Sequence, residues 1–494
     1  MSGPHGAQET LNARHLLSNS DPTRSQFDAR NYVVLKLDGE QRVQGTILRL
    51  NDHEVICRVH SPDVVFHAGL ELTDSHIVLG NRTAYCGQAD VNHVLDTGVG
   101  TILEIGLGQG WFSSVDDSES MLSKRGRYLP DIQGTRRALR QIDYAFKIVV
   151  ADILTLLQDL QERLELLEME LRHLVLDERA TYELEIMSLI ETEMLPELDE
   201  VFREFESVAL WVPSDDVDLH LAYVQKHLHP FLVCSPFIHR VHEKPLGYPG
   251  DYRMLNQLLD DPYVGGSLFA KTLNAWIIGT SAGDAYRYRI DLLTETLTDE
   301  LRERGGNPVE ILNVGCGAAR ELQNLVNQGA RHLKRARFSL MDFNAPTLEH
   351  CEEQLSELCE RLNCELDARY LHLNVQQLLA EGRRRDGELE LSLGSLDVIY
   401  CAGLFDYLSE DLCVRLISLF YDLLAPGGRI VLSNFSASNP IRHFMSYLLE
   451  WHLTYRSREE LHGLVPTKIR SEAWITDDSS PDGVENYLHI RKPC

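Results

Sequence analysis

Two glycines, Gly315 and Gly317, stand where a short apolar run, Glu310–Val314, meets a helix-like segment. Glycine lets the backbone turn tightly and brings its N–H groups close to a ligand without an intervening Cβ. The turn opens onto the start of a helix, where free N–H donors favour a carboxylate or a hydroxyl-rich ligand. These residues therefore predict a ligand-binding turn between a strand and a helix.

A carboxylate follows this turn at a useful spacing. The run Phe338–Asp342 is typical of a second strand and ends on an acid, 27 residues after Gly315. In an open α/β sheet, an acid at that place reaches the ribose hydroxyls of a nucleoside lying across the strand ends. The two motifs together predict a nucleoside-binding crevice.

Three further segments continue the pattern in order: a third strand at Ala368–Asn374, a fourth at Leu396–Gly403, and a turn into a fifth at Leu424–Leu432. The whole series resembles the class I S-adenosylmethionine-dependent methyltransferases. The resemblance implies a Rossmann-like, seven-stranded α/β domain over residues 301–494, with S-adenosylmethionine as cofactor. A dinucleotide site is disfavoured, because its G-x-G-x-x-G pattern would need glycine at Arg320.

Two residues depart from the family pattern. Asn313 replaces the usual acid before the glycines, which removes a charge but keeps a hydrogen-bonding side chain. Ala319 replaces the usual third glycine at the start of the helix. The residues that the resemblance places around the cofactor are Gly315, Cys316 and Gly317 at the methionine part, Asp342 and Phe343 at the ribose, Asn374 and Val375 at the adenine, and Cys401 and Ala402 beneath the methionine.

A second motif precedes the glycine turn. The segment Glu243–Asn256 holds two glycines and two prolines among aromatic and charged residues, which is typical of a rigid irregular loop leading into a helix. It is either an ordinary interhelix turn or a functional lid. As a lid, the segment is expected to contact the cofactor through Tyr248 and Asp251. Asp251 could instead cap the following helix. The rings of Tyr248 and Tyr252 could cover the cofactor's sulfonium, since an aromatic face attracts a cation.

This loop sharpens the resemblance. Its Pro-Leu-Gly-Tyr-x-Gly-Asp-Tyr pattern, ahead of a G-C-G-x-A-R-E turn, resembles a group of bacterial methyltransferases, some of which methyl-esterify 3-hydroxy fatty acids to make cell-density signals. The resemblance extends over roughly residues 230–494. The further segments that share it are Ala285–Arg289, Asn439–Met445, Glu450–Arg456 and Gly483–Leu488.

The acceptor side offers several candidates. Arg287 could pair with a carboxylate of the cofactor or the substrate, or form a surface ion pair. Arg442, Trp451 and Arg456 follow the fifth strand, where this fold often builds the acceptor pocket. A carboxylate acceptor is already ionised at neutral pH and needs no strong base; for a hydroxyl acceptor, His443 could act as one. Tyr252 is the third candidate for a catalytic role, beside Arg287 and His443.

Composition limits the class of partner. The 494 residues carry a formal charge of −28 and a pI near 5.1, which argues against a nucleic-acid partner, because phosphate backbones are bound by Lys and Arg. The one dense basic run, Arg383–Arg385, is predicted to be a solvated loop. No signal segment, membrane-length apolar run or zinc-like cysteine spacing is found, so we expect a cytoplasmic protein with free thiols and no metal.

Upstream of the catalytic domain we expect four parts: a loose N-terminus (1–25), a β-barrel (26–125), a long helical hairpin or coiled-coil-like segment (130–206), and a helical lid or cap (207–300). The barrel weakly resembles the PilZ-like barrels of cyclic-dinucleotide proteins. However, Arg24 and Arg30 are wrongly spaced for that ligand and Glu104–Gly108 lacks the serine, so a docking or dimerising barrel is favoured. A second glycine pattern at Ile102–Gly110 is rejected as a cofactor turn, because no helix follows it.

The expected barrel strands are Tyr32–Leu37, Gln44–Leu50, Glu54–Val59 and Ile77–Leu79. Apolar residues recur at steps of three and four from Leu139 to Leu174, with one stutter, which predicts a long helix. It pairs either with a second copy, as a homodimer seam over 139–174, or with the next helix, Tyr182–Phe205.

The leading hypothesis is a methyltransferase that uses S-adenosylmethionine on an oxygen of a small acidic or lipid-like acceptor, such as the carboxylate of a 3-hydroxy fatty acid. The competing hypothesis is a regulatory protein that senses the cofactor or a cyclic dinucleotide with an inactive methyltransferase fold. An N- or C-methyltransferase acting on another metabolite would share the same site.

Overall fold

The structure is a computed structural model. It describes residues 32–36, 42–50, 53–59, 66–67, 69–79, 82–96, 101–108, 132–171, 173, 176–329, 333–381 and 392–494. The predicted loose N-terminus, residue 174 and the basic run 383–385 lie outside these ranges. The chain forms two compact units, each described by itself: Met1–Lys147 with Val212–Tyr223 and Pro245–Tyr248, and Ile148–Trp211 with Val224–Lys244 and Pro249–Cys494.

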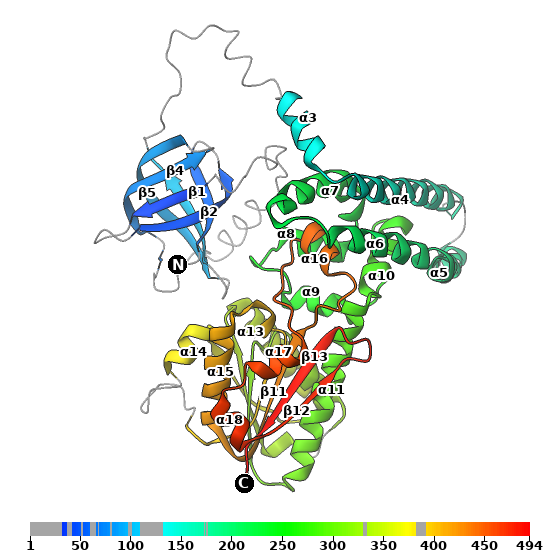
Figure 1. Cartoon of the computed structure of the whole chain (residues 1–494). Helices are drawn as coiled ribbons and strands as arrows, with labels where there is room; N and C mark the ends of the chain where they lie inside the picture. Colours follow the sequence, from blue (N-terminus) through cyan, green and yellow to red (C-terminus); the bar gives the residue numbers. More distant parts are fainter. Residues whose placement is uncertain are drawn as a thin grey trace, which may run out of the picture. The chain divides into compact units, whose positions relative to one another are not determined.

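The first unit contains a closed antiparallel barrel of six strands (Figure 1). The strands are β1 (Tyr32–Lys36), β2 (Arg42–Leu50), β3 (Glu54–Val59), β4 (Glu71–Leu79), β5 (Arg82–Asp96) and β6 (Thr101–Leu107), in the order β1-β2-β3-β6-β5-β4. Alternate residues point inward, as Val33 and Leu35 do from β1, because side chains of a strand alternate between its faces. The predicted N-terminal barrel is confirmed.

The rejected glycine pattern lies on a barrel strand. Gly106 is paired with Glu54 of β3 and with Asp90 of β5, so it belongs to an antiparallel ladder. A cofactor turn needs a strand that leads directly into a helix. Gln109 and Gly110, which end the pattern, lie outside the described residues.

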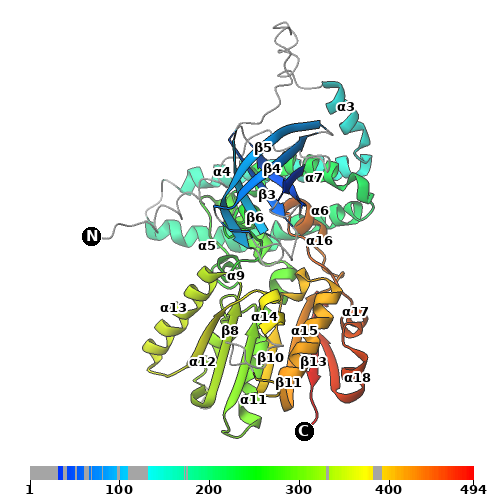
Figure 2. The same cartoon turned by 90° about the vertical axis from the view of Figure 1, so that its left-hand side faces the viewer.

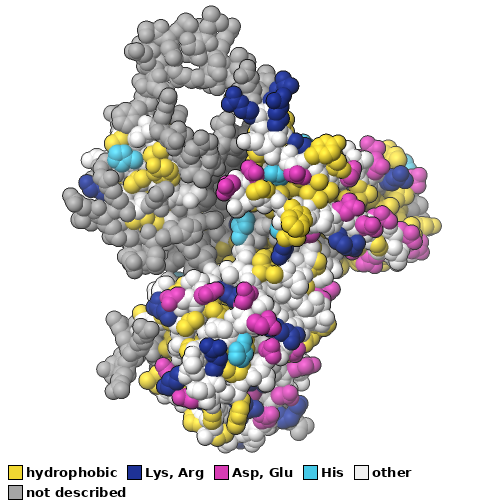
Figure 3. Space-filling view, in the orientation of Figure 1, with side chains coloured by type: hydrophobic (Ala, Val, Ile, Leu, Met, Phe, Trp, Pro, Cys, Tyr) yellow, Lys and Arg dark blue, Asp and Glu magenta, His cyan; other side chains and the backbone are white. Residues whose placement is uncertain are grey.

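The helical region begins with α3 (Ile132–Gln141) and α4 (Tyr144–Leu171), followed by α5 (Leu176–Glu193) and α6 (Leu195–Ala209). The buried stripe of α4 runs through Phe146, Ile153, Leu157 and Leu164, so Leu157 takes the place expected of Leu156, which is half-buried. Leu139 is exposed on α3. On the face shown in Figure 3, described Asp and Glu side chains are gathered over α4 to α6, with Lys and Arg scattered among them.

The predicted helix Tyr182–Phe205 is wrong in its bounds, because the structure ends α5 at Glu193 and starts α6 at Leu195. Pro196 lies in the first turn of α6. Proline has no N–H and clashes with the preceding turn of a continuous helix, but fits the first turn of a new one.

The second part of the helical region precedes the C-terminal domain in the chain. It comprises η2 (Ser214–Asp216), α7 (Val217–Leu232), α8 (Pro236–Glu243), α9 (Tyr252–Gln257), α10 (Leu268–Ile278) and α11 (Ser281–Glu303). The helix α10 is buried on nearly all sides. Its Trp276 ring stacks on Phe202 of α6 at 4.5 Å, and both rings meet Phe444 edge-on, at 5.3 and 5.1 Å between centroids. Phe444 belongs to α16 (Arg442–Leu448) of the C-terminal domain, so these helices share one aromatic core.

The C-terminal domain is built on one sheet in the order β12-β13-β11-β10-β7-β8-β9. Its strands are β7 (Val309–Val314), β8 (Ala336–Asp342), β9 (Asp367–His372), β10 (Leu396–Cys401), β11 (Leu424–Phe435), β12 (Trp474–Ser479) and β13 (Glu485–Arg491). The first five in chain order pair in parallel, and β13 pairs antiparallel with both β11 and β12. The strand order reverses between β7 and β10, the place where open α/β sheets bind ligands at the carboxyl ends of their strands.

Two hydrophobic cores cover the two faces of this sheet. One is formed with α11, α12 (Arg320–Asn327) and α13 (Ala345–Leu362). The other is formed with α14 (Val375–Glu381), α15 (Glu410–Leu423), α17 (Arg458–Gly463) and α18 (Thr467–Glu472) (Figure 2). Short 3₁₀ turns complete the domain at η3 (Leu333–Arg335) and η4 (Phe405–Tyr407). Among the described residues, no helix has the length and apolar character needed to cross a membrane.

Candidate functional site

The glycine turn lies directly after β7, between that strand and α12. Gly315 and Gly317 have φ angles of +77° and +52°, a region that side chains other than glycine rarely adopt. The N–H groups of Gly315 and Cys316 donate to the carbonyl of Met341 on β8, at 2.8 and 2.9 Å. Ala319 also has a positive φ, +46°. The backbone at this position therefore carries some strain, because its residue has a Cβ.

Asp342, at the carboxyl end of β8, faces this turn. Its Oδ2 accepts from the Gly317 N–H at 3.1 Å, and its Oδ1 accepts from the Asn344 N–H at 3.0 Å. Asn344 in turn caps α13 by accepting from Thr347. Burial raises the pKa of Asp342 to about 6, against the opposing effect of these backbone N–H groups. The structure thus holds a desolvated carboxylate beside the glycine turn.

A second buried acid, Glu321 of α12, reaches back to the end of β7. Its Oε1 accepts from Asn313 Nδ2 at 3.1 Å and from the Tyr400 hydroxyl at 2.9 Å. Burial raises the pKa of Glu321 to about 7. A carboxyl group is therefore present beside Asn313, contributed by the following helix. Sequence reasoning did not assign Glu321, although it closes the G-C-G-x-A-R-E motif.

A buried arginine, Arg289 of α11, lies at the end of β10. Its Nε donates to Glu485 Oε2 at 3.0 Å, and its Nη2 lies 2.6 Å from Glu485 Oε1. A Cβ built on Gly403 would lie 2.5 Å from Arg289 Nη1, so the guanidinium reaches the residue that follows the fourth strand. Arg289 was not assigned a role from the sequence, although it is the last residue of the Ala285–Arg289 segment.

Arg287, the predicted carboxylate partner, occupies a different place. Its Nη1 donates to the Leu258 carbonyl at 2.8 Å, and its Nη2 donates to the Ile278 carbonyl at 2.9 Å. It also pairs with Asp284 at 2.8 Å. These contacts tie together the ends of α9 and α10, so Arg287 positions the segment above the site.

The helix α9 lies over the glycine turn. A Cβ built on Gly317 would lie 3.7 Å from Leu255 Cδ1. Tyr252 is buried and its ring stacks on His350 of α13 at 4.4 Å between centroids. Asn256 Nδ2 lies 3.3 Å from His350 Nε2. The helix α9 therefore lies at the carboxyl ends of β7 and β8.

Asp251 holds the lid helix in place. Its Oδ1 accepts from the N–H groups of Arg253 and Met254 at the start of α9, at 2.9 and 3.1 Å. The same carboxylate pairs with Arg240 Nη2 of α8 at 2.8 Å. The structure thus gives Asp251 the helix-capping role. Tyr248, partly buried, belongs to the first compact unit.

Trp451 lies at the other end of the lid. Its Nε1 donates to the Tyr407 hydroxyl at 2.8 Å. A Cβ on Gly250, whose φ is +84°, would meet that hydroxyl at 3.1 Å and Trp451 Cζ2 at 3.5 Å. These residues form an aromatic wall beside the lid loop, and substitution of Gly250 would disturb it.

The other residues predicted for the acceptor pocket are held by contacts within the protein. Arg456 is buried, and donates to the carbonyls of Phe405 and Leu408 and to Asn434 Oδ1, at 2.6–2.8 Å. Arg442 Nε contacts His443 Nε2 at 3.2 Å. Burial, with a smaller effect of Arg442, lowers the pKa of His443 to about 4, so this imidazole is neutral at pH 7.

Glu206 of α6 fixes the start of α16. Its carboxylate accepts from the N–H groups of His443 and Phe444 at 3.0 and 2.7 Å. Burial raises the pKa of Glu206 to about 7. This contact anchors the segment after β11 to the helical region.

The remaining predicted cofactor residues all follow the strands of the sheet. Asn374 and Val375 begin α14 after β9, and Asn374 Oδ1 accepts from the Gln377 N–H at 2.9 Å. Phe343 follows Asp342, and its carbonyl lies 2.9 Å from His372 Nε2. Cys316, between the two glycines, and Cys401, which ends β10, are buried, and Ala402 is partly buried.

The chemistry of these groups fits a zwitterionic nucleoside. A buried carboxylate, Asp342, accepts hydroxyl hydrogens, as a ribose would offer them. The guanidinium of Arg289 suits a carboxylate, and the carboxylate of Glu321 suits an ammonium group. Glycines with positive φ leave the turn open to close approach by a ligand.

Comparison with known proteins agrees with this arrangement. A family model described as a methyltransferase domain matches residues 312–430. This range holds the glycine turn, Asp342, Glu321 and the strands from β7 into β11. The chain therefore contains a methyltransferase domain, and the prediction of a methyltransferase is confirmed. No curated protein matches the sequence.

Several solved structures are similar to parts of the chain. A possible exported protein from Bordetella parapertussis is 14% identical over 61% of this chain and 96% of its own, with a TM-score of 0.42. Magnesium protoporphyrin IX methyltransferase from Synechocystis PCC 6803, with bound S-adenosylhomocysteine, is 10% identical over 42% and 84%, with a TM-score of 0.31. The N-methyltransferase NodS from Bradyrhizobium japonicum WM9 is 16% identical over 49% and 98%, with a TM-score of 0.30. At these scores the neighbours carry no argument about the acceptor.

Proposed function

We propose, from the premise that residues 312–430 form a methyltransferase domain, that the chain is a class I enzyme that uses S-adenosylmethionine. We further propose an oxygen of a small acidic or lipid-like molecule as acceptor, with the carboxylate of a 3-hydroxy fatty acid as the leading candidate. One observation carries the cofactor proposal: the buried Asp342 carboxylate lies 3.1 Å from the Gly317 N–H at the carboxyl end of a parallel sheet.

The proposed cofactor contacts follow from the positions of the side chains. Asp342 would accept from the ribose hydroxyls, and the turn at Gly315–Gly317 would approach the methionine part. Arg289 would pair with the cofactor's carboxylate while Glu485 keeps its guanidinium oriented. Asn374 and Val375 would border the adenine. In this assignment Arg289 takes the role expected of Arg287.

Glu321 supports an active enzyme over an inactive, cofactor-sensing one. The regulatory hypothesis rests on Asn313, which lacks the usual charge, and on the appended N-terminal barrel. The structure places the Glu321 carboxylate against the Asn313 amide at 3.1 Å. An ionisable carboxyl group is thus present at the place where the ammonium group of the cofactor would lie, and that cation would favour its ionised form.

When bound, the cofactor would supply a methyl group on a positively charged sulfur. The chain's own contribution would be alignment and exclusion of water, since methyl transfer to an ionised carboxylate needs no general base. The lid helix α9 lies over the glycine turn, with Leu255 nearest to Gly317. Asp251, Arg240 and Arg287 hold this lid by backbone and ionic contacts. We therefore assign to Arg287 a positioning role.

The acceptor would lie along the aromatic wall formed by Tyr407 and Trp451 beside Gly250. Burial raises the pKa of the Tyr407 hydroxyl, so it stays protonated and donates rather than accepts a proton. Apolar rings with one polar edge suit an acceptor with a hydrocarbon part and a small polar head. This chemistry favours a lipid-like acid over a highly charged metabolite.

The test combines cofactor binding and product identification. Wild-type protein would be incubated with labelled S-adenosylmethionine and a lipid extract, and the labelled product identified by mass spectrometry. Asp342→Asn should lose both cofactor binding and labelling. Asp367→Asn is the matched control, because Asp367 lies at the opposite edge of the same strands and pairs with exposed Arg337. Undetectable binding of S-adenosylmethionine to the wild-type protein at millimolar concentration would refute the proposal.

A further inference from the structure

A cavity of about 220 Å³ lies on the sheet, away from the residues assigned to the cofactor. Its lining residues are Arg429, Trp474, Thr476, His489 and Arg491. They come from the three adjacent strands β11, β13 and β12. Arg491 pairs with both Arg429 and Trp474, and His489 pairs with Thr476. Because residues at paired and alternate positions share a face, all five side chains point to the same side of the sheet.

The opposite face of these strands packs in a hydrophobic core. Ile430 and Ile490, the next residues along β11 and β13, are buried in the core formed with α15, α17 and α18. The cavity face, in contrast, carries charged and polar side chains together with an exposed indole. This face of the three strands therefore lies outside that core.

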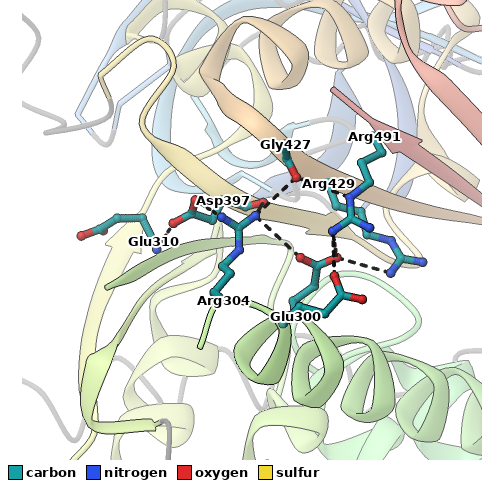
Figure 4. Close-up of polar contacts among 8 residues, drawn as sticks. Glu300, Arg304, Glu310, Asp397, Gly427, Arg429 and Arg491 are labelled. Carbon is teal, nitrogen blue, oxygen red and sulfur yellow. Dashed lines mark hydrogen bonds and ion pairs between the residues drawn. The ribbon is translucent and has the colours of Figure 1, made fainter. Parts of the chain in front are cut away.

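The cavity adjoins a network of three arginines and three acids (Figure 4). Arg304 is paired closely, with Asp397 Oδ1 at 2.6 Å. Arg491 pairs with the exposed Glu303 at 2.9 Å. Glu300 is 2% exposed. Its carboxylate oxygens lie 3.7 Å from Arg304 and 3.5 Å from both Arg429 and Arg491, so it forms a longer ion pair with each of these arginines.

Of these three arginines, Arg429 has the longest distance to its nearest described acidic oxygen. Among the described residues, its nearest acidic oxygen is that of Glu300, at 3.5 Å. Its shortest hydrogen bond, 3.0 Å, goes to His489 Nδ1. Burial, and then Arg429 itself, lower the pKa of His489 to about 4, so the ring is a neutral acceptor at pH 7. The shortest hydrogen bond of the Arg429 guanidinium is therefore to a neutral group.

Trp474 supplies the apolar side of the cavity. Its side chain is 63% exposed although it lies next to Arg491 on the neighbouring strand. An indole is a flat surface on which a ring can stack, and guanidinium groups bind carboxylates through paired N–H donors. The Thr476 hydroxyl can donate a further hydrogen bond. Together these groups match a flat molecule with one anionic end.

We propose that this cavity is a second ligand site, which binds a small aromatic carboxylate. Arg429 and Arg491 hold the carboxylate, Trp474 stacks on the ring, and Thr476 orients it. Glu300 and Glu303 of α11 pair with these arginines without lining the cavity. The site is independent of the proposed reaction, and its test does not require the cofactor.

Isothermal titration with benzoate, which has a carboxylate on a flat ring, tests the site directly. A nine-atom ligand of ordinary efficiency should bind with a dissociation constant on the order of 1 mM. Cyclohexanecarboxylate, with the same charge but no flat ring, should bind several-fold more weakly. Inorganic phosphate, an anion without a ring, should bind more weakly than benzoate.

Two variants and one control separate the site from general charge effects. Arg429→Gln should weaken benzoate binding by about tenfold or more, because it removes a charge-assisted hydrogen bond. Trp474→Ala should weaken benzoate binding but leave phosphate unchanged, and Trp474 is exposed enough for the variant to fold. Arg458→Gln is the control, since Arg458 contacts Ser479 of β12 without lining the cavity.

Saturable benzoate binding that both variants weaken and the control preserves would support the site. Absence of saturable heat up to about 10 mM benzoate, or equal binding by wild type and Arg429→Gln, would overturn it. Equal affinity for benzoate and phosphate, unchanged in Trp474→Ala, would overturn the assignment of an aromatic ligand. Melting temperatures of the variants would show that each remains folded.

Discussion

The substitution Asp342→Asn separates stability from cofactor binding. Burial raises the pKa of Asp342 from its ordinary 3.8 to about 6, which corresponds to about 3 kcal/mol. The folded pKa lies above the unfolded one, so this group's contribution to stability is present below pH 4 and is lost as the pH rises through 6. At pH 8 the ionised carboxylate therefore destabilises the folded protein.

Asparagine removes that penalty but also loses an acceptor. Its amide oxygen can replace one carboxylate oxygen, while its NH₂ group must face the other N–H donor, of Gly317 or Asn344. An unmet buried donor costs about 1–3 kcal/mol. At pH 8 the variant's free energy of unfolding should therefore equal that of wild type or exceed it by up to about 2 kcal/mol. At pH 4 it should be less stable than wild type, because the penalty is absent there.

The affinity for the cofactor should fall in the Asp342→Asn variant. Hydrogen bonds to a charged group contribute about 1.5–3 kcal/mol each, and the amide retains one weaker, neutral bond. The net loss of about 2–4 kcal/mol corresponds to about 30- to 1000-fold in the dissociation constant of S-adenosylhomocysteine. For the wild type, affinity should rise with pH up to about 6 and then level off, because the ionised carboxylate is the better acceptor.

Calorimetric titrations between pH 5 and 8, paired with urea unfolding at the same pH values, measure both quantities. Asp367→Asn serves as control, with expected changes within about 0.5 kcal/mol in stability and none in affinity. The reasoning is refuted if Asp342→Asn binds S-adenosylhomocysteine as wild type does. A large stability loss of this variant at pH 8 would refute the raised pKa of Asp342, because the ionised carboxylate would then stabilise the fold.

Three other substitutions test the surrounding shell. Glu321→Gln should raise the free energy of unfolding at pH 9 but not at pH 4. Burial raises the pKa of Glu321 to about 7, so its ionised form is penalised only above that pH. Urea titrations at the two pH values check this, and equal effects at both would contradict it. Arg289→Met should lower the free energy of unfolding by about 3–5 kcal/mol, since it leaves the buried Glu485 without its partner. A melting temperature equal to that of wild type would disprove this ion pair. Asp251→Ala should speed hydrogen exchange in α9, with about 1–2 kcal/mol of lost protection from the missing cap and ion pair, whereas unchanged exchange would show that the lid is held by other contacts.

Local patterns predicted the strands that surround the cofactor site well. Glycines after an apolar run and an acid at the end of the next one are short-range signals, and the structure places both at the carboxyl edge of the sheet. The barrel was predicted from four strands, but β5 (Arg82–Asp96) was not among them. Residues 88–92 do alternate between polar and apolar, but Asn92 and His93 interrupt the alternation where the pairing of β5 with β6 shifts register.

Roles that depend on tertiary packing were harder to assign. Arg287 and Arg289 are two residues apart on α11, and residues at that spacing lie on nearly opposite sides of a helix. The sequence does not state which side faces the sheet, and the structure turns Arg289 inward and Arg287 toward the lid. Glu321 was overlooked for a similar reason, because its partner Tyr400 is distant along the chain.

The contact between Glu206 and the start of α16 limits how this protein can be divided. Phe444, on that helix, packs its ring against Phe202 and Trp276 of the preceding region. A fragment that began at residue 301 would present this ring to water and leave two backbone amides without their carboxylate. Biochemists who wish to isolate the methyltransferase domain should therefore begin the expressed fragment upstream of α6, since shorter versions would be prone to precipitate.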